Sequence, residues 1–152
     1  MGEPFVATEA WDAERPWAFV VYCSDGRWHD AVEEFLRARV SRRSDVYALP
    51  GGPAVFSPWS SALDEARVSE KAFRFLIEYH QIQSVWLIAH EGCAYYLERY
   101  GPFVEADLRR RQHDDLRRAR QTIAGWYPQL DIHTVYAALE AGRVVLTTLP
   151  AD

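Results

Sequence analysis

The sequence predicts an α/β fold: a mostly parallel central sheet flanked by helices, with an antiparallel hairpin at its C-terminal edge. Two observations predict it. Short apolar runs fit strands that are buried on both faces, and longer charged amphipathic segments alternate with them. The composition agrees, because 152 residues with 49% hydrophobic and 26% charged residues are typical of one globular domain.

The first half of the chain contains two strand and two helix candidates. Residues 1–16 are expected to form an extended or loosely helical N-terminal arm, followed by a single domain over 17–152. The apolar run at 17–23 is a strand candidate that stops at Ser-Asp-Gly, which is turn chemistry. After it we expect a helix at 29–43, a strand at 45–49, an aromatic loop at 54–63 and a helix at 64–81.

The second half repeats the alternation and then ends in two adjacent strands. We expect a strand at 84–90, a long charged helix at 103–126, and strands at 131–139 and 143–149 around a Glu-Ala-Gly turn. In a parallel sheet, ligands bind just beyond the carboxyl ends of the strands. Two predicted strand ends carry polar motifs there, Cys23-Ser-Asp-Gly-Arg27 and His90-Glu-Gly-Cys93.

The charge and the apolar runs exclude several classes of protein. With 17 basic and 22 acidic residues the net charge is -5, so nucleic acid is not an expected partner. No apolar run reaches the roughly 20 residues that a membrane span needs. The N-terminus has acids and a proline where a signal peptide needs a basic start. We therefore expect a cytoplasmic protein with reduced cysteines and no membrane partner.

The two cysteines and one histidine form the strongest candidate site. Cys23 ends the first predicted strand, His90 ends the third, and Cys93 follows three residues later. If these strands are neighbours, two thiolates and one imidazole converge, which is a suitable ligand set for zinc. Three protein ligands leave a fourth position for water or a carboxylate, as in catalytic zinc sites.

Other interpretations of the same three residues remain open. Each cysteine alone could be a small buried hydrophobe, and His90 alone could be a hydrogen-bonded residue at a strand end. A disulfide between Cys23 and Cys93 is a third possibility, disfavoured in a reducing compartment. The metal site is preferred because both cysteines of the chain fall at predicted strand ends.

Asp25 and Arg27 are candidates for a functional pair beside the metal. Asp25 could equally be a turn aspartate, and Arg27 a surface charge. As a pair, Arg27 would keep Asp25 ionised, and Asp25 would then accept a hydrogen bond from a zinc-bound water. Asp25 could instead bind the zinc and close the site.

Together, Cys-x-Asp-x-Arg at one strand end and His-x-x-Cys at another resemble the motifs of the β-class carbonic anhydrases. The resemblance extends over about residues 17–149. It implies Zn²⁺ bound by Cys23, His90 and Cys93, and a dyad of Asp25 and Arg27. It also implies a zinc lyase in which zinc hydroxide attacks CO2 or a similar small linear electrophile. The partners that it implies are CO2 or bicarbonate as substrate and a second copy of the chain, in a homodimer or higher even oligomer with the zinc sites near the interface.

The chain departs from that family around the motifs. Gly26 stands where the family commonly has Ser, and Ala89 and Ala94 stand where it commonly has Gly. Residues 49–53, Leu-Pro-Gly-Gly-Pro, replace a loop that bears arginine and asparagine. Two alternatives therefore accompany the prediction: a carbonyl sulfide or carbon disulfide hydrolase using the same site, and a non-catalytic zinc-binding protein.

Two further features have weaker implications. His29 could be a proton shuttle, although a surface histidine at a helix start is the preferred interpretation. Phe56, Pro58 and Trp59 are apolar residues on a predicted loop, which suggests an interface.

Overall fold

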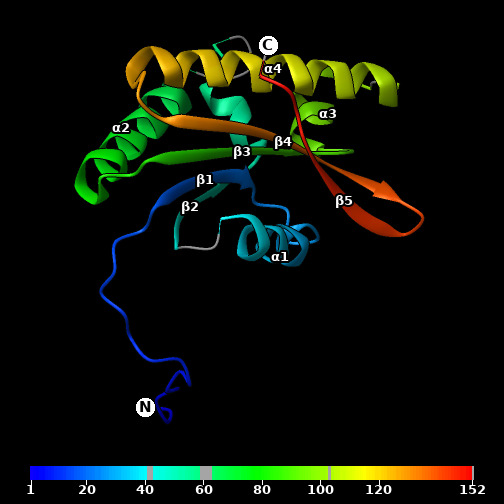
Figure 1. Cartoon of the computed structure of the whole chain (residues 1–152). Coiled ribbons are helices and arrows are strands. Elements are labelled where there is room, and N and C mark those ends of the chain that lie inside the picture. Colours follow the sequence, from blue (N-terminus) through cyan, green and yellow to red (C-terminus); the bar gives the residue numbers. More distant parts are fainter. Residues whose placement is uncertain (41–42, 59–62, 103, 152) are drawn as a thin grey trace.

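The computed structural model describes residues 1–40, 43–58, 63–102 and 104–151. Residues 1–16 contain no helix or strand and extend away from the sheet (Figure 1). The elements that follow are β1 (Ala18–Cys23), α1 (His29–Arg39), β2 (Ser44–Leu49), the 3₁₀ helix η1 (Gly52–Phe56), α2 (Leu63–His80), β3 (Ser84–His90), α3 (Ala94–Tyr100), α4 (Glu105–Trp126), β4 (Asp131–Glu140) and β5 (Arg143–Thr148).

The strands form one sheet in the order β2-β1-β3-β4-β5. Strands β1 to β4 run parallel to one another, whereas β5 pairs antiparallel with β4 through the turn after Glu140. The predicted fold class is therefore confirmed, including the C-terminal hairpin at the sheet edge. Among the described residues, no helix has the length and apolar character needed to cross a membrane.

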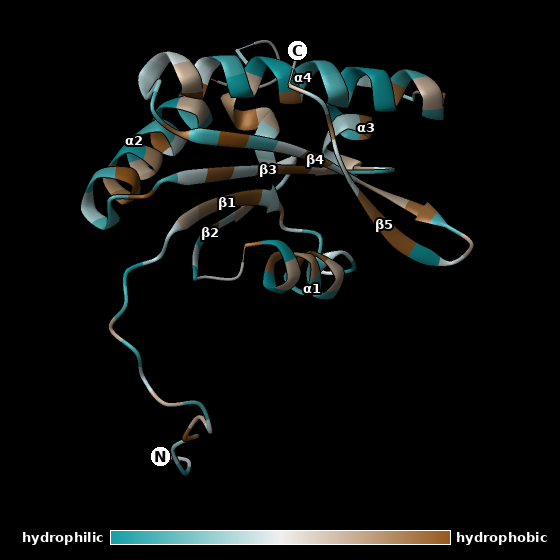
Figure 2. Ribbon diagram, viewed as in Figure 1, coloured by the Kyte–Doolittle hydropathy of each residue, from teal (hydrophilic) through white to brown (hydrophobic). Residues whose placement is uncertain are grey.

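Helices cover both faces of the sheet, which explains the continuous apolar runs of the central strands. On one face, Phe19 and Val21 of β1 pack in a core with side chains of η1, α2 and α4. On the other face, Val20 and Tyr22 pack against α1. Figure 2 shows the apolar colour concentrated in the strands between these layers, while the outer surface of α4 is polar.

Three predicted boundaries are corrected. The helix predicted over 29–43 ends at Arg39, because the Arg43 carbonyl accepts the Trp17 N–H at 2.9 Å beside the sheet, while residues 41–42 lie outside the described residues. The loop predicted over 54–63 is wrong at both ends. Residues 52–56 are helical because Pro53 begins a 3₁₀ turn, and α2 already begins at residue 63.

The interface predicted on that loop is wrong for Phe56. Phe56 is 3% exposed, and its ring packs edge-on against Phe73 in the core, 5.5 Å between centroids. Pro58 is exposed, and Trp59 lies outside the described residues. Phe56 is therefore a core residue, because the 3₁₀ turn directs it into the layer between the sheet and α4.

The segment between β3 and β4 contains one helix that the sequence did not predict. α3 has only seven residues, too few for a helical pattern to stand out. The long helix predicted over 103–126 is present as α4 from Glu105, and residue 103 lies outside the described residues.

The carboxyl ends of β1 and β3, which are adjacent parallel strands, form a switch point in the topology of the sheet. After β1 the chain enters α1 on one face, whereas after β3 it continues through α3 to α4 on the opposite face (Figure 1). Connections that leave neighbouring strands toward opposite faces open a ligand crevice between them. Both polar motifs lie at this point.

Candidate metal centre

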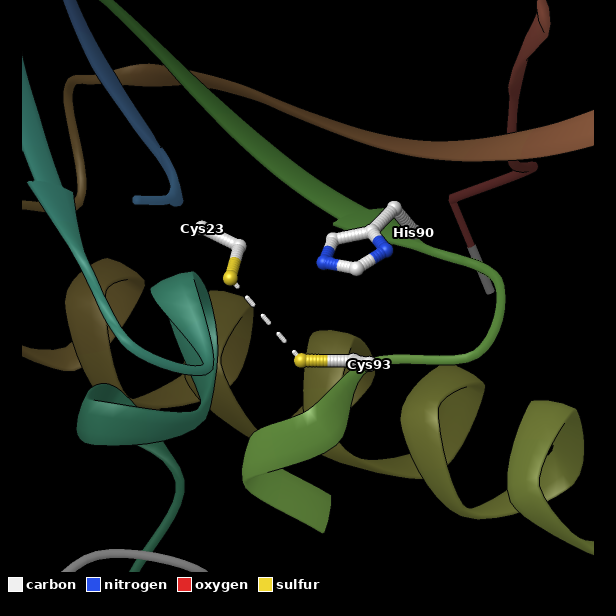
Figure 3. A group of neighbouring side chains, drawn as sticks. All are labelled: Cys23, His90 and Cys93. Carbon is white, nitrogen blue, oxygen red and sulfur yellow. Dashed lines mark hydrogen bonds between the residues drawn. The ribbon is translucent and has the colours of Figure 1, made fainter. Parts of the chain in front are cut away.

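Cys23, His90 and Cys93, which we call the metal group, converge at the carboxyl ends of β1 and β3 (Figure 3). Cys23 is the last residue of β1, His90 is the last of β3, and Cys93 is the N-cap of α3. Their side-chain donor atoms all lie within 4.8 Å of one another. The residues are 8%, 4% and 2% exposed, so the group is buried. Within the described part of the chain, no carboxylate belongs to this cluster.

The spacing of the two sulfurs fits a tetrahedral metal. The Sγ atoms of Cys23 and Cys93 are 3.9 Å apart, and both cysteines are free. Two Zn–S bonds of about 2.3 Å at a tetrahedral angle place their sulfurs about 3.8 Å apart. A disulfide, with sulfurs about 2.05 Å apart, does not describe this pair.

The hydrogen bonding of His90 determines which of its ring nitrogens could bind a metal ion. Its Nδ1 lies 2.8 Å from the Glu91 carbonyl, and because a carbonyl only accepts, Nδ1 carries the proton and donates. Nε2 is buried and has no hydrogen-bond partner within the described residues. An unsatisfied buried nitrogen is costly, and a metal ion would satisfy it. The residues of the metal group therefore fit a zinc ion.

The two thiols lie within hydrogen-bond distance of each other, with 3.9 Å between their Sγ atoms. A hydrogen bond from the Cys93 thiol lowers the pKa of Cys23, burial opposes this, and His90 and the backbone at Asp25 and Gly51 lower that pKa further. The same hydrogen bond, together with burial, raises the pKa of Cys93. Cys23 is thus the first of the pair to become a thiolate. A cation would take the place of the proton between the two sulfurs.

Asp25 and Arg27 form the predicted pair on the turn after β1. Arg27 Nη2 donates to Asp25 Oδ2 at 2.6 Å, and its Nε donates to Oδ1 at 3.0 Å. The Arg27 backbone N–H also donates to Oδ1 at 3.1 Å. Hydrogen bonds from Arg27 lower the pKa of Asp25 to about 2, so the carboxylate is ionised at neutral pH. Its catalytic role stays a prediction.

Trp28 is a site residue that the sequence analysis missed. It is 7% exposed, and its ring lies over the imidazole of His90 with 4.6 Å between ring centroids. Trp28 directly follows the Cys-x-Asp-x-Arg motif, and that adjacency is the only signal for it in the sequence. It covers one side of the buried imidazole.

The Pro-Gly-Gly-Pro turn also belongs to the site. Gly52 has φ +51°, and a Cβ there would lie 2.8 Å from the backbone nitrogen of Cys23. Gly51 has φ +78°, and its Cβ would lie 2.5 Å from the ring of Tyr95. The glycines therefore allow the turn to pack directly against the ligand strand and against α3. The sequence identifies residues 49–53 only as a replacement for a loop of the resembled family, and it does not predict these contacts.

His29 lies apart from the metal group. Its Nδ1 is 2.7 Å from the hydroxyl of Tyr22, and Tyr22 packs in the core on the α1 face of the sheet. Cys23 packs instead with Cys93 and Tyr96. The structure thus brings together five of the predicted site residues in two clusters, and places His29 against Tyr22 rather than beside a ligand.

Comparison with known proteins gives one family and one fold. A family model described as "Putative carbonic anhydrase" matches residues 13–145. No curated protein sequence matches the chain. Among solved structures, the β-carbonic anhydrase CafA of Aspergillus fumigatus is 10% identical, with a TM-score of 0.58 over 88% of this chain and 76% of that one.

Two further structures give the same result. A tetrameric β-carbonic anhydrase of Sordaria macrospora is 11% identical, with a TM-score of 0.58 over 91% of this chain and 84% of that one. The carbonic anhydrase of Streptococcus mutans is 15% identical, with a TM-score of 0.53 over 91% and 87%. At such identities the likeness establishes the fold, while the family match spans most of the chain. The chain therefore belongs to the carbonic anhydrase-related family that this model describes, as a divergent member with the β-carbonic anhydrase fold.

Proposed function

We propose that this protein is a zinc-dependent, carbonic anhydrase-like lyase that hydrates CO2 or a similar small linear electrophile. Cys23, His90 and Cys93 would hold the zinc, and Asp25 with Arg27 would serve the reaction. The observation that carries the proposal is the buried Nε2 of His90, which has no hydrogen-bond partner among the residues that the structure describes. It belongs to a group whose two sulfurs are spaced as zinc ligands.

The chemistry divides between the metal and the chain. A zinc ion in this group would supply hydroxide near neutral pH, because it lowers the pKa of a bound water from about 15.7 to about 7. Asp25 stays ionised beside Arg27, so it can accept a hydrogen bond from the attacking water and orient it. Trp28 shields the imidazole of His90 from solvent. The Glu91 carbonyl fixes the imidazole tautomer that leaves Nε2 free to bind.

The alternative substrates use the same residues. Carbonyl sulfide and carbon disulfide are small, linear and uncharged like CO2, so their hydrolysis at this site is the second candidate. A non-catalytic zinc-binding role is the third.

We further propose a homodimer or a higher even oligomer, located in the cytoplasm. Exposed apolar side chains line the outer face of α2 at Val68, Phe75 and Tyr79, with exposed fractions of 61–65%. A second copy of the chain would cover them. The reducing cytoplasm would keep the Cys23 and Cys93 thiols available to a metal.

Two measurements on purified protein test the proposed activity. We expect about one zinc per chain, lost in Cys93→Ala. In stopped-flow CO2 hydration, Asp25→Ala should retain zinc but lose about 100-fold or more in kcat/KM. Asp114→Ala is a matched control, because it breaks a 2.8 Å aspartate–arginine pair with Arg117 on α4.

Each outcome separates the candidates. A reduced, chelator-free preparation without metal would refute the zinc site. Zinc without CO2 hydration, but with hydrolysis of carbonyl sulfide or carbon disulfide, would favour the second candidate. Zinc with no activity on any of these substrates would leave the non-catalytic role.

A further inference from the structure

Gln112 of α4 is a fully buried amide beneath the metal group. It is 0% exposed, and its Nε2 donates to the backbone carbonyl of His90 at 2.7 Å. Its Oε1 accepts a hydrogen bond from the Tyr136 hydroxyl at 3.2 Å. Both ends of the amide are therefore satisfied, and one of them holds the residue that carries the imidazole ligand.

Asp115 lies one helical turn further along the same face of α4 and is 1% exposed. Its Oδ1 accepts from the Ser57 hydroxyl at 2.7 Å, and its Oδ2 accepts from the Tyr96 hydroxyl at 2.8 Å. Nitrogens of Arg111 and Arg118 lie 3.5 and 3.7 Å away. These donors satisfy the hydrogen-bonding capacity of the buried carboxylate. Loss of one donor weakens the contact between Asp115 and the chain segment that carries that donor.

These contacts reach the chain segments that carry the ligands. Tyr96 is in the first turn of α3, and its backbone N–H donates to the Cys93 carbonyl at 3.1 Å. Ser57 follows η1, where Gly52 packs against the backbone of Cys23. The polar face of α4 thus bonds to the end of β3, to the start of α3, and to the end of η1.

We propose that Gln112 and Asp115 are positioning residues for the metal group. Gln112 fixes the backbone of His90, and Asp115 fixes Cys93 through Tyr96. The inference rests on the proposed zinc site. An apolar residue at either position would fill the same space in the core. It would, however, leave the end of β3 and the start of α3 free to shift relative to each other. The two residues set the distances between ligand atoms before a metal arrives.

A ligand set that is held in place binds metal more tightly than one that must be ordered first. Loss of a hydrogen-bonding partner behind metal ligands typically weakens metal binding by about 10- to 100-fold. The effect should also change the ligand geometry, which the visible absorption of Co²⁺ bound to thiolates reports independently of activity.

The test measures Zn²⁺ affinity by competition with a chromophoric chelator and the absorption spectrum of the Co²⁺ form. Tyr96→Phe removes one hydroxyl that bonds to Asp115, and Gln112→Met removes the amide at similar volume. Tyr47→Phe is the matched control, because it removes a hydroxyl bonded to Ser69 at 2.9 Å between β2 and α2. Urea denaturation of each apo-protein measures its stability separately.

We expect Tyr96→Phe and Gln112→Met to weaken Zn²⁺ binding by about 10- to 100-fold and to shift the Co²⁺ spectrum. Tyr47→Phe should keep wild-type affinity even where its apo-protein is equally destabilised. Wild-type affinity and an unchanged spectrum in Tyr96→Phe would overturn the inference, and this variant decides alone if Gln112→Met does not fold. Wild-type protein that fails to bind Zn²⁺ would instead refute the proposed function on which it rests.

Discussion

His90 shows how the surroundings of one side chain determine its chemistry. The Glu91 carbonyl accepts a hydrogen bond from Nδ1, Trp28 covers the ring, and Gln112 donates to the His90 backbone carbonyl. Nε2 is left buried without a partner in the described part of the chain. These contacts restrict the orientation of the imidazole, so the lone pair of Nε2 is the one available to bind a metal ion.

Replacing Trp28 tests the contact to the imidazole. We expect Trp28→Leu to weaken Zn²⁺ binding by about tenfold, because the imidazole loses its aromatic cover and gains solvent contact. Trp28→Phe keeps an aromatic ring and should retain most of the affinity. Competition with a chromophoric chelator measures both. Trp11→Leu, at an 89% exposed arm residue, is the control, and an equal loss there would contradict the assignment.

Replacing Gly52 tests the packing of the turn against β1. Gly52→Ala and Gly142→Ala both place a side chain at positive φ, which costs about 1–2 kcal/mol. Only at Gly52 would the new Cβ also meet backbone, 2.8 Å from the nitrogen of Cys23. We expect Gly52→Ala to lower the free energy of unfolding by about 1–3 kcal/mol more than Gly142→Ala. Urea denaturation of the metal-free variants decides, and equal losses would refute the close approach.

At the scale of elements, α4 combines two roles that its sequence does not separate. Its outer side carries ion pairs such as Arg117–Asp114, in line with the charged helix that the sequence predicts. Its inner side buries Leu116 and Ile123 in the core, and also buries Gln112 and Asp115. The helix thus covers the sheet with its apolar residues and holds the ligand segments with its polar ones.

We expect His113 to make the packing of α4 on β4 depend on pH. Its ring packs edge-on against Tyr136, 4.9 Å between centroids, and its Nε2 is buried. Burial lowers the pKa of His113, and Arg109 lowers it further. The unfolded chain therefore binds this proton more tightly than the folded one. The neutral His113 side chain therefore contributes to the free energy of unfolding above about pH 6.5. This contribution is lost as the pH falls through the lower pKa that His113 has in the folded state.

Urea denaturation between pH 5 and 7.5 measures this effect. We expect the free energy of unfolding of wild-type protein to fall on acidification more steeply than that of His113→Gln, which has no titrating group at this position. Parallel curves for the two proteins would show that His113 titrates alike in the folded and unfolded chain.

At the scale of the whole molecule, the sheet topology assembles the site. Residues 23 and 90 are far apart in sequence, but β1 and β3 pair in parallel, so their carboxyl ends meet. The helices after them pack on opposite faces of the sheet, which makes the strand ends between them a switch point. The fold therefore supplies the position, and the side chains supply the chemistry.

Metal removal should destabilise the whole domain. A ligand that binds only the folded state stabilises it by about 4 kcal/mol when present at 1,000 times its dissociation constant. We expect dialysis against a chelator to lower the Tm in differential scanning calorimetry, and added Zn²⁺ to restore it. Cys93→Ser should show no such shift, and a Tm insensitive to chelator in wild-type protein would contradict zinc binding by the folded chain.

The proposed dimer gives a prediction about mass in solution. Phe75 is 61% exposed on α2, and a charge there would be buried unpaired against a second copy. We expect Phe75→Glu to reduce the mass in sedimentation velocity to that of a monomer. Val104→Glu, at a 71% exposed residue near the start of α4, should leave the assembly unchanged. A monomeric wild-type protein would refute the proposed assembly.

The sequence by itself determined the order and type of most elements and the three members of the metal group. Buried strands appear as unbroken apolar runs, as at 18–23 and 84–90, and both cysteines lie at or just after the ends of such runs. These are local patterns, so the sequence displays them directly. The pair of Asp25 and Arg27 is equally local, because only one residue separates them on one turn.

Tertiary structure alone decided which groups support that site. Trp28 contacts His90, Gln112 reaches the His90 carbonyl from 22 residues away, and Asp115 reaches Tyr96. Such contacts depend on how α4, α1 and the sheet pack, and no spacing along the chain encodes them. The short helix α3 and the 3₁₀ turn at η1 were missed for a similar reason, since packing and the positive-φ glycine before η1 stabilise them more than any sequence pattern does.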